Sequence, residues 1–228
     1  MVYSSFCSRC ITARKRGADE SDRYSALIFV LLTIFLSVIS SHLTPRLTNA
    51  QTKKGPAPPL TEARYQDRQP LKLPLVRPRI LVRKSQRQLL LFSGDKLVRT
   101  YRIGLGLSPS GDKVREGDRR TPEGDFYIFT KNDKSAYYLS LGISYPNAVH
   151  AQRGLRDGLI TKAQYDGIMR ALRSGKAPPQ NTRLGGEIYI HGNGAGSDWT
   201  WGCVALENHD IRELFEAVSI GTPVTIEP

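Results

Sequence analysis

Cysteine is rare in this sequence: the chain has three cysteines and four histidines among 228 residues. Cys7 and Cys10 have CxxC spacing, but no second pair and no histidine ligands follow them, so they are a weak candidate for a metal or redox site. If the first fifty residues are removed, Cys203 is the last cysteine left and an internal disulfide is excluded. Exported proteins usually pair their cysteines, so a lone thiol is an accident, an intermolecular bridge or a reactive group.

Acidic residues are outnumbered: 33 lysines and arginines face 21 aspartates and glutamates, for a formal net charge of +12. Residues 1–50 hold six basic and three acidic side chains, so the rest of the chain is basic as well. A basic surface favours nucleic acid, a membrane surface or an acidic cell-wall polymer, although a solvated surface without a partner carries the same charge. The chain lacks a recognition-helix pattern, zinc-finger spacing and an aromatic RNA-binding signature, so we expect no nucleic-acid partner.

The amino-terminal segment has the pattern of an export signal. Ala26 to Ile39 are fourteen residues without a charge, with basic residues before them and Thr48-Asn49-Ala50 after them. This order of basic, apolar and small residues is typical of a secretory signal. The twenty residues from Tyr24 to Leu43 are also long enough to span a bilayer. The sequence therefore predicts that residues 1–50 are a signal peptide or a membrane anchor, and that the protein resides in the periplasm or cell envelope.

Two further regions follow. Residues 51–78 are rich in proline among basic and polar residues, which predicts a semi-extended linker. Residues 79–228 predict one folded domain, mainly β, a sandwich or barrel, because short β-type runs alternate with turn residues. The expected strands are 80–82, 88–92, 96–103, 125–130, 138–143, 187–191 and 224–226.

Two short helices are expected among these strands. One begins after Thr161, a good N-cap, and runs to Gly175 with apolar residues at helical spacing. It lies in an insertion between His150 and Thr182. The other covers about 208–221 and begins five residues after Cys203.

Cys203 and His191 form a candidate nucleophile and base. His191 ends a predicted strand, and Cys203 follows it by twelve residues in a glycine-rich run that lets the chain fold back. A free thiol with a pKa of about 8.5 is only a few per cent ionised at neutral pH, so a neighbouring imidazole that takes its proton makes it reactive. Gly202 permits close approach of the backbone to a substrate, and the amides from Gly202 to Val204 are candidates for an oxyanion hole.

Less reactive roles explain the same residues. Cys203 can be a buried structural thiol, and His191 can be a core histidine. A metal site would need a third ligand, for which His209 and Asp198 are available, but the spacing fits no common zinc pattern and we expect no metal. His150 has no obvious partner in the sequence.

The stretch around Cys203 resembles the L,D-transpeptidase catalytic domain, the YkuD-type family of bacterial cell-wall enzymes. His191-Gly192 resembles the family's HG pair at a strand end, and Thr200-Trp201-Gly202-Cys203 resembles its S/T-x-G-C turn. Thr121-Pro122-Glu123-Gly124 is similar to the family's TPxG loop beside the substrate groove. The resemblance covers Arg79 to Glu227.

This resemblance implies a cysteine acyltransferase that acts on peptidoglycan stem peptides without a metal or organic cofactor. Cys203 would be the nucleophile, His191 the general base and acid, the carbonyl of Gly192 would orient the ring, and the backbone of Gly202 would lie in the oxyanion region. The acceptor would be a stem amine, a lysine of an envelope lipoprotein, or water. The resemblance also implies these substrate-binding residues: Arg120, Thr121, Pro122, Gly124, Asn193, Thr200 and Trp201.

One position departs from the family pattern. Many members have arginine two residues after the cysteine, where this chain has Ala205. Without that arginine, an L,D-carboxypeptidase or endopeptidase that hydrolyses stem peptides is the alternative, with Arg120 or Arg183 as other sources of positive charge. A second alternative is a peptidoglycan-binding module without catalysis, in which Cys203 would have ordinary thiol reactivity.

Overall fold

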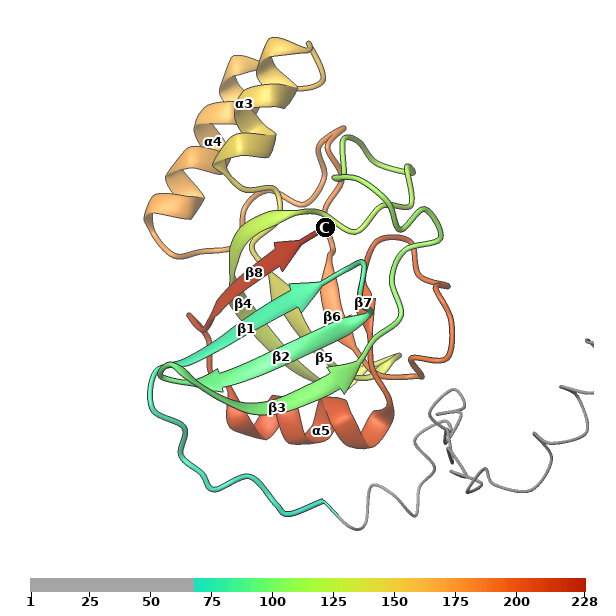
Figure 1. The fold of residues 1–228 in the computed structure, drawn as a ribbon. Coiled ribbons are helices and arrows are strands. Elements are labelled where there is room, and N and C mark those ends of the chain that lie inside the picture. The colour runs from blue at the N-terminus through green and yellow to red at the C-terminus, as the bar shows by residue number, and fades with distance from the viewer. Residues whose placement is uncertain (1–67) are drawn as a thin grey trace, which may run out of the picture. The chain divides into compact units, whose positions relative to one another are not determined.

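The computed structural model describes residues 68–228, so the predictions for residues 1–67, a signal peptide or anchor and most of the linker, lie outside it. Eight strands form one sheet in the order β3-β2-β1-β8-β4-β5-β6-β7 (Figure 1). Their bounds are Pro78–Arg83 for β1, Gln88–Ser93 for β2, Lys96–Arg102 for β3, Gly124–Ser135 for β4, Tyr138–Ile143 for β5, Tyr189–His191 for β6, Val204–Ala205 for β7 and Pro223–Glu227 for β8.

The sheet curls until its two edges meet. The peptide N–H of Gly104, just beyond β3, donates to the carbonyl oxygen of Ala205 in β7 at 2.9 Å, and the reverse bond has the same length. β8 pairs in parallel with β1, with Ile80 opposite Val224. In both strands buried residues alternate with more exposed ones, which is the period of a sheet with one face on a core. The curl encloses that face.

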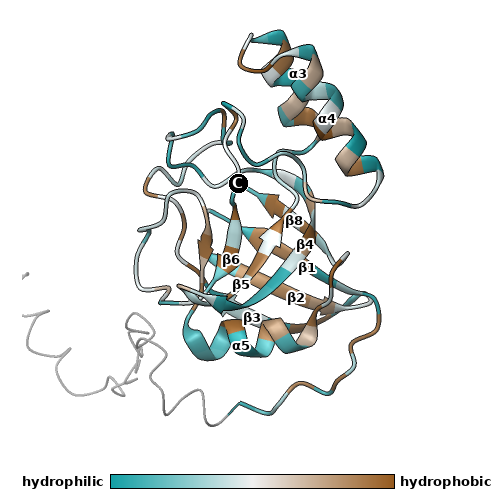
Figure 2. Cartoon of the chain, turned by 180° about the vertical axis from the view of Figure 1, so that it is seen from behind, coloured by the Kyte–Doolittle hydropathy of each residue, from teal (hydrophilic) through white to brown (hydrophobic). Residues whose placement is uncertain are grey.

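The mainly β fold predicted from the sequence is confirmed. Each of the seven expected strands is present, β4 being longer and β6 shorter than expected. The two-residue strand β7 was not predicted, because so short a run has no pattern of its own and exists through its pairing with β6. The predicted helix after Cys203 is α5 (Asn208–Ala217), which packs Ile211 and Leu214 into the core against the curled sheet (Figures 1 and 2).

The insertion holds two helices, where the sequence analysis expected one. α4 (Lys162–Arg173) is the expected helix, and Thr161 and Gln164 form a capping box at its start. The additional helix is α3 (Ala148–Arg156), which Asn147 caps by accepting a hydrogen bond from the peptide N–H of His150. The buried residues of α3 are His150, Ala151 and Gly154, and Leu155 packs partly buried beside them, so this short helix offers few large apolar residues to a prediction from sequence. The two helices pack together over a small apolar cluster of their own.

The described end of the predicted linker, residues 68–77, lies on the domain. Arg68 forms an ion pair with Asp210 of α5 at 2.8 Å. Leu71 and Leu75 pack against the core, and the carbonyl oxygen of Val76 accepts from the peptide N–H of Gly94 at 2.6 Å. Within residues 68–228, no helix has the length and apolar character needed to cross a bilayer.

Candidate active site

Cys203 and His191 line the same cavity, which has a volume of about 440 Å³. Its walls come from the β4–β5 hairpin, from β6 and the residues before it, and from the loop that leads to Cys203. The lining residues are Asn132, Lys134, Ser135, Ala136, Tyr137, Ser140, Glu187, Tyr189, His191, Trp199, Thr200, Trp201 and Cys203.

The register of β6 and β7 brings the two side chains to one face. The strands pair in parallel, with Ile190 beside Val204 and His191 beside Ala205. The same register, extended by one residue, places Cys203 opposite Tyr189. Because side chains alternate along a strand, Tyr189, His191 and Cys203 face the same side. The peptide N–H of Tyr189 donates to the Cys203 sulfur at 3.4 Å, and that sulfur lies 3.6 Å from the carbonyl oxygen of Glu187.

Two threonines hold the turn that carries the nucleophile. The Thr200 hydroxyl donates to the carbonyl oxygen of Cys203 at 2.8 Å and accepts from the peptide N–H of Gly202 at 3.1 Å. The Thr121 hydroxyl accepts from the peptide N–H of Gly106 at 3.0 Å and lies 3.5 Å from the same Cys203 oxygen. Because the Gly202 amide is already bonded, Cys203 itself supplies the open amide: within residues 68–228 its N–H has no hydrogen-bond partner.

Gly106 allows the turn and the Thr121 loop to pack closely, and this gives a prediction about stability. A Cβ atom at Gly106 would lie 2.2 Å from the carbonyl oxygen of Arg119 and 3.2 Å from the Cα of Gly202. We expect Gly106→Ala to lower the free energy of unfolding by about 1–3 kcal/mol, because backbone must move. Urea denaturation measures this. Gly196→Ala is the matched control, since a Cβ there meets no atom within 4 Å, and equal midpoints for the two variants would contradict the prediction.

His191 is held in one tautomer. Its Nδ1 lies 2.8 Å from the carbonyl oxygen of Gly192, an acceptor only, so Nδ1 carries the proton and Nε2 has the lone pair in the neutral ring. The rings of Tyr137 and Trp199 lie 4.6 and 5.5 Å from the imidazole ring, centre to centre. Burial lowers the pKa of His191, and the Gly192 hydrogen bond opposes that shift. His191 is therefore neutral at pH 7 and able to accept a proton.

Burial also decides the resting state of the thiol. It raises the pKa of Cys203 to about 11, although the Tyr189 N–H and the charge of Lys113 act in the opposite direction. The free protein therefore holds a neutral thiol and a neutral imidazole at pH 7. Proton transfer must then accompany attack on the substrate, which is general-base catalysis.

The structure places the expected substrate-binding residues at different depths. Thr200 and the exposed Trp201 line the cavity, and the Arg119 guanidinium lies 4.8 Å from the Trp201 ring centre. Asn193 is exposed and is held by the Asn208 side chain. The remaining expected residues do not line this cavity: Thr121 and Pro122 are buried, Gly124 begins β4, and Arg120 donates to the carbonyl oxygen of Asp112 at 3.3 Å. Their role in substrate binding stays a prediction.

The other positions raised by the sequence have structural partners or lie away from the Cys203 cavity. Ala205 is buried and closes the sheet, and Arg183 is exposed and lines a separate hollow with Arg115. Asp198 forms an ion pair with Arg87, and His209 lies 3.5 Å from Asp210. Neither of these two lines the Cys203 cavity.

Several lining residues were missed by the sequence analysis. Tyr189 could have been found, because it lies two residues before His191 on one strand and so shares its face. Trp199 falls in the same glycine-rich run as Cys203. Lys134 and Tyr137 could not have been found, because only the pairing of β4 with β5 and β6 brings their hairpin beside His191.

Residues 77–226 match the YkuD family, described as the L,D-transpeptidase catalytic domain. The matched region is more than half of the 228 residues. No curated protein matches the chain.

Solved structures share limited similarity with the chain. A point variant of the helical cell shape determining protein Pgp2 from Campylobacter jejuni is 23% identical, with a TM-score of 0.45, over 66% of this chain and 46% of its own. Bd1075 from Bdellovibrio bacteriovorus is 22% identical, with a TM-score of 0.45, over 67% and 48%. An L,D-transpeptidase from Mycobacterium smegmatis is 10% identical, with a TM-score of 0.40, over 67% and 59%. This chain thus spans about half the length of the first two.

Proposed function

This chain belongs to the L,D-transpeptidase catalytic domain family, and we propose that it is an exported cysteine acyltransferase acting on peptidoglycan stem peptides. The observation that carries the proposal is the cavity shared by Cys203 and His191, with Nδ1 of the histidine bound to the Gly192 carbonyl. That bond leaves Nε2 as the one ring nitrogen able to take the thiol proton.

The reaction has two halves. In the first, His191 Nε2 takes the Cys203 proton while the sulfur attacks the carbonyl carbon of the diamino acid in a tetrapeptide stem. The Cys203 amide stabilises the oxyanion. The carbon–nitrogen bond to D-alanine then breaks, and His191 returns the proton to the leaving amine. A thioester remains on Cys203.

In the second half an acceptor attacks the thioester and the thiol is regenerated. A neighbouring stem amine gives a cross-link, a lysine of an envelope lipoprotein gives protein attachment, and water gives a carboxypeptidase or endopeptidase. The buried Ala205, in place of the arginine of many members, favours hydrolysis as the second candidate.

The products of a disaccharide-tetrapeptide test these options. The full chain is incubated with this substrate and the mixture is analysed by mass spectrometry. Loss of D-alanine together with a cross-linked dimer supports transpeptidation. Loss of D-alanine with tripeptide monomer alone supports hydrolysis. If the folded protein retains the substrate without turnover, a binding module is the better description and the proposed activity is wrong.

Lys134 is expected to bind a substrate carboxylate. It is the one lysine or arginine among the described residues that line the cavity, and no side-chain partner for it lies within residues 68–228. Stem peptides are anionic, and a charge-assisted hydrogen bond contributes about 1.5–3 kcal/mol. We expect Lys134→Ala to raise KM about tenfold with little change in kcat, as measured by steady-state kinetics. Lys96→Ala, on an exposed lysine at the start of β3, is the control. An unchanged KM for Lys134→Ala would reject this role.

The amino-terminal proposals have their own test. Residues 1–50 would direct export and residues 51–78 would tether the domain in the periplasm or cell envelope. Cell fractionation followed by amino-terminal sequencing distinguishes the two forms: a soluble protein that begins at Gln51 has lost a signal peptide, and an intact membrane-bound chain has kept an anchor.

A further inference from the structure

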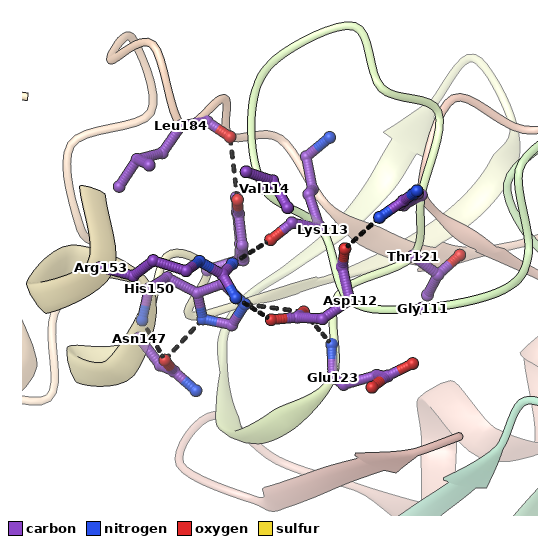
Figure 3. Close-up of polar contacts among 12 residues, drawn as sticks. Gly111, Asp112, Lys113, Val114, Thr121, Glu123, Asn147, His150, Arg153 and Leu184 are labelled. Carbon is purple, nitrogen blue, oxygen red and sulfur yellow. Dashed lines mark hydrogen bonds and ion pairs between the residues drawn. The ribbon is translucent and has the colours of Figure 1, made fainter. Parts of the chain in front are cut away.

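A cluster of charged and polar side chains joins α3 to the loop between β3 and β4, and its residues do not line the Cys203 cavity (Figure 3). Asp112 lies in the loop, and His150 and Arg153 lie on α3. We propose, on the basis of the function above, that these three are positioning residues for Cys203. They anchor the loop that contains Thr121, and Thr121 in turn holds the turn of the nucleophile.

Asp112 is the centre of the cluster. Its Oδ1 accepts from Nε2 of His150 at 3.0 Å and from the peptide N–H of Glu123 at 2.8 Å, and its Oδ2 accepts from Nη1 of Arg153 at 2.8 Å. Burial acts to raise the pKa of Asp112, but these hydrogen bonds together hold that pKa well below its usual range. The carboxylate is therefore charged at neutral pH, and each of its three donors comes from a defined place in the fold.

His150 fixes the geometry on the side of α3. Its side chain is 1% exposed and packs against the rings of Phe126 and Tyr145. Nδ1 lies 2.5 Å from Oδ1 of Asn147, an oxygen that also caps α3. Both ring nitrogens thus face side-chain oxygens, so the ring links Asp112 to the residue at the start of α3. The ring can hold Asp112 and Asn147 together in this orientation only.

Lys84 connects the Asp112 end of the loop to Thr121. Its ammonium group is buried, with 2% of the residue exposed, and donates to the carbonyl oxygens of Gly111 at 2.7 Å and Thr121 at 3.0 Å. It also pairs with the Glu123 carboxylate at 2.7 Å. The peptide N–H of Glu123 also bonds Asp112, so Lys84 binds both ends of the 111–123 segment and Asp112 binds its last residue.

Thr121 completes the path to the nucleophile. It is fully buried, and its hydroxyl lies between the Gly106 amide and the Cys203 carbonyl oxygen. A shift of the Asp112 loop therefore moves Thr121, and with it the backbone oxygen of Cys203. Contacts from α3 reach the catalytic residue without any contribution from the substrate cavity.

The Asp112–Arg153 pair is half-buried, and desolvation of such charges cancels much of their attraction, so the pair is a poor source of stability. Their geometric demands are strict, however, since each unpaired partner would be costly. The cluster therefore acts mainly by fixing the position of the loop that contains Thr121. Misplacement of a reacting group by about 1 Å can cost up to about a hundredfold in rate, so a small loop shift has a large effect on turnover.

Variants of the full chain test the proposal. Asp112→Asn and His150→Gln keep the side-chain size and break the charged contacts, and Lys162→Ala removes an exposed ion pair of α4 as the matched control. We expect the first two to lower kcat about tenfold with KM within about twofold of wild type. The rate at which iodoacetamide alkylates Cys203 should also change by about threefold or more, while Lys162→Ala should alter none of these values.

The readouts separate position from stability and from the proposed function. All rates are measured well below each variant's melting temperature. A lower melting temperature with unchanged kcat and alkylation rate would show a purely structural cluster and overturn the proposal. If wild type itself shows no turnover, the proposed function fails, and an unchanged alkylation rate would then overturn the positioning role separately. If Asp112→Asn does not fold, Arg153→Lys, which keeps the charge and loses the guanidinium fork, replaces it under the same criteria.

Discussion

Cys203→Ala is expected to abolish turnover of a disaccharide-tetrapeptide, with kcat falling by at least about four orders of magnitude. The sulfur is the group that forms the thioester, and no other described residue lining the cavity has a thiol to replace it. The fold should be unaffected, because alanine is smaller than cysteine and fits the same space. Circular dichroism and the melting temperature provide that control.

Covalent trapping gives an independent measurement of the same prediction. Members of the family that this chain resembles react with carbapenems, whose strained ring carbonyl takes the place of the peptide carbonyl. Intact mass spectrometry should show one added carbapenem on wild type and none on Cys203→Ala. Because Cys7 and Cys10 are also thiols of the full chain, peptide mapping must locate the adduct. A folded wild-type protein that remains unmodified at Cys203 would contradict the acyltransferase proposal.

His191→Gln is expected to lower kcat about 10²- to 10⁴-fold, the usual contribution of a general base. Glutamine is close to histidine in size but cannot take the thiol proton. His209→Gln is the matched control, because that histidine does not line the cavity. Equal losses in the two variants would show that the effect does not arise from proton transfer at the site.

The pH profile follows from the two shifted groups. Catalysis needs neutral His191, and because burial lowers its pKa, activity should persist below pH 6.5 and fall only through the lowered value. Catalysis also needs the Cys203 proton in place, and the alkaline limb should therefore lie near the raised pKa of about 11. Alkylation by iodoacetamide should rise about tenfold per pH unit up to that value. Rapid alkylation at pH 6 would instead indicate a preformed thiolate–imidazolium pair and contradict the neutral resting state.

The parts of the fold that sequence could predict are those with a local period or a motif. Alternating apolar residues such as Ile80 and Val82 define strands, and Thr161 with Gln164 defines the start of α4. α3 could not be predicted, because its buried face is formed by His150, Ala151 and Gly154. His150 on this helix bonds Asp112, which lies 38 residues away in the sequence, so no local pattern announces that contact.

The residues of the site also divide into those that a local pattern predicts and those that it does not. Cys203 and His191 could be paired from the glycine-rich run between them, because a strand end and a nearby turn return to one another locally. Thr121 was expected in the substrate groove from its motif, while the structure gives it a contact beneath the Cys203 turn. The walls from Lys134 and Tyr137 depend on sheet pairing between distant segments. The pairing of such distant strands cannot be predicted from a short stretch of sequence.

The position of β8 has a consequence for how the domain is made. This last of the described strands lies in the middle of the sheet, between β1 and β4. Its partner residues in β1 lie more than 140 positions earlier in the sequence. Pairings over such long sequence separations form late and slowly. A nascent chain that has not yet delivered residues 223–227 lacks the strand that pairs with both β1 and β4, so the contact between Gly104 and Ala205 is left to join the two halves of the sheet. The thiol site is therefore expected to reach the described geometry only once residues 223–227 have been made and paired.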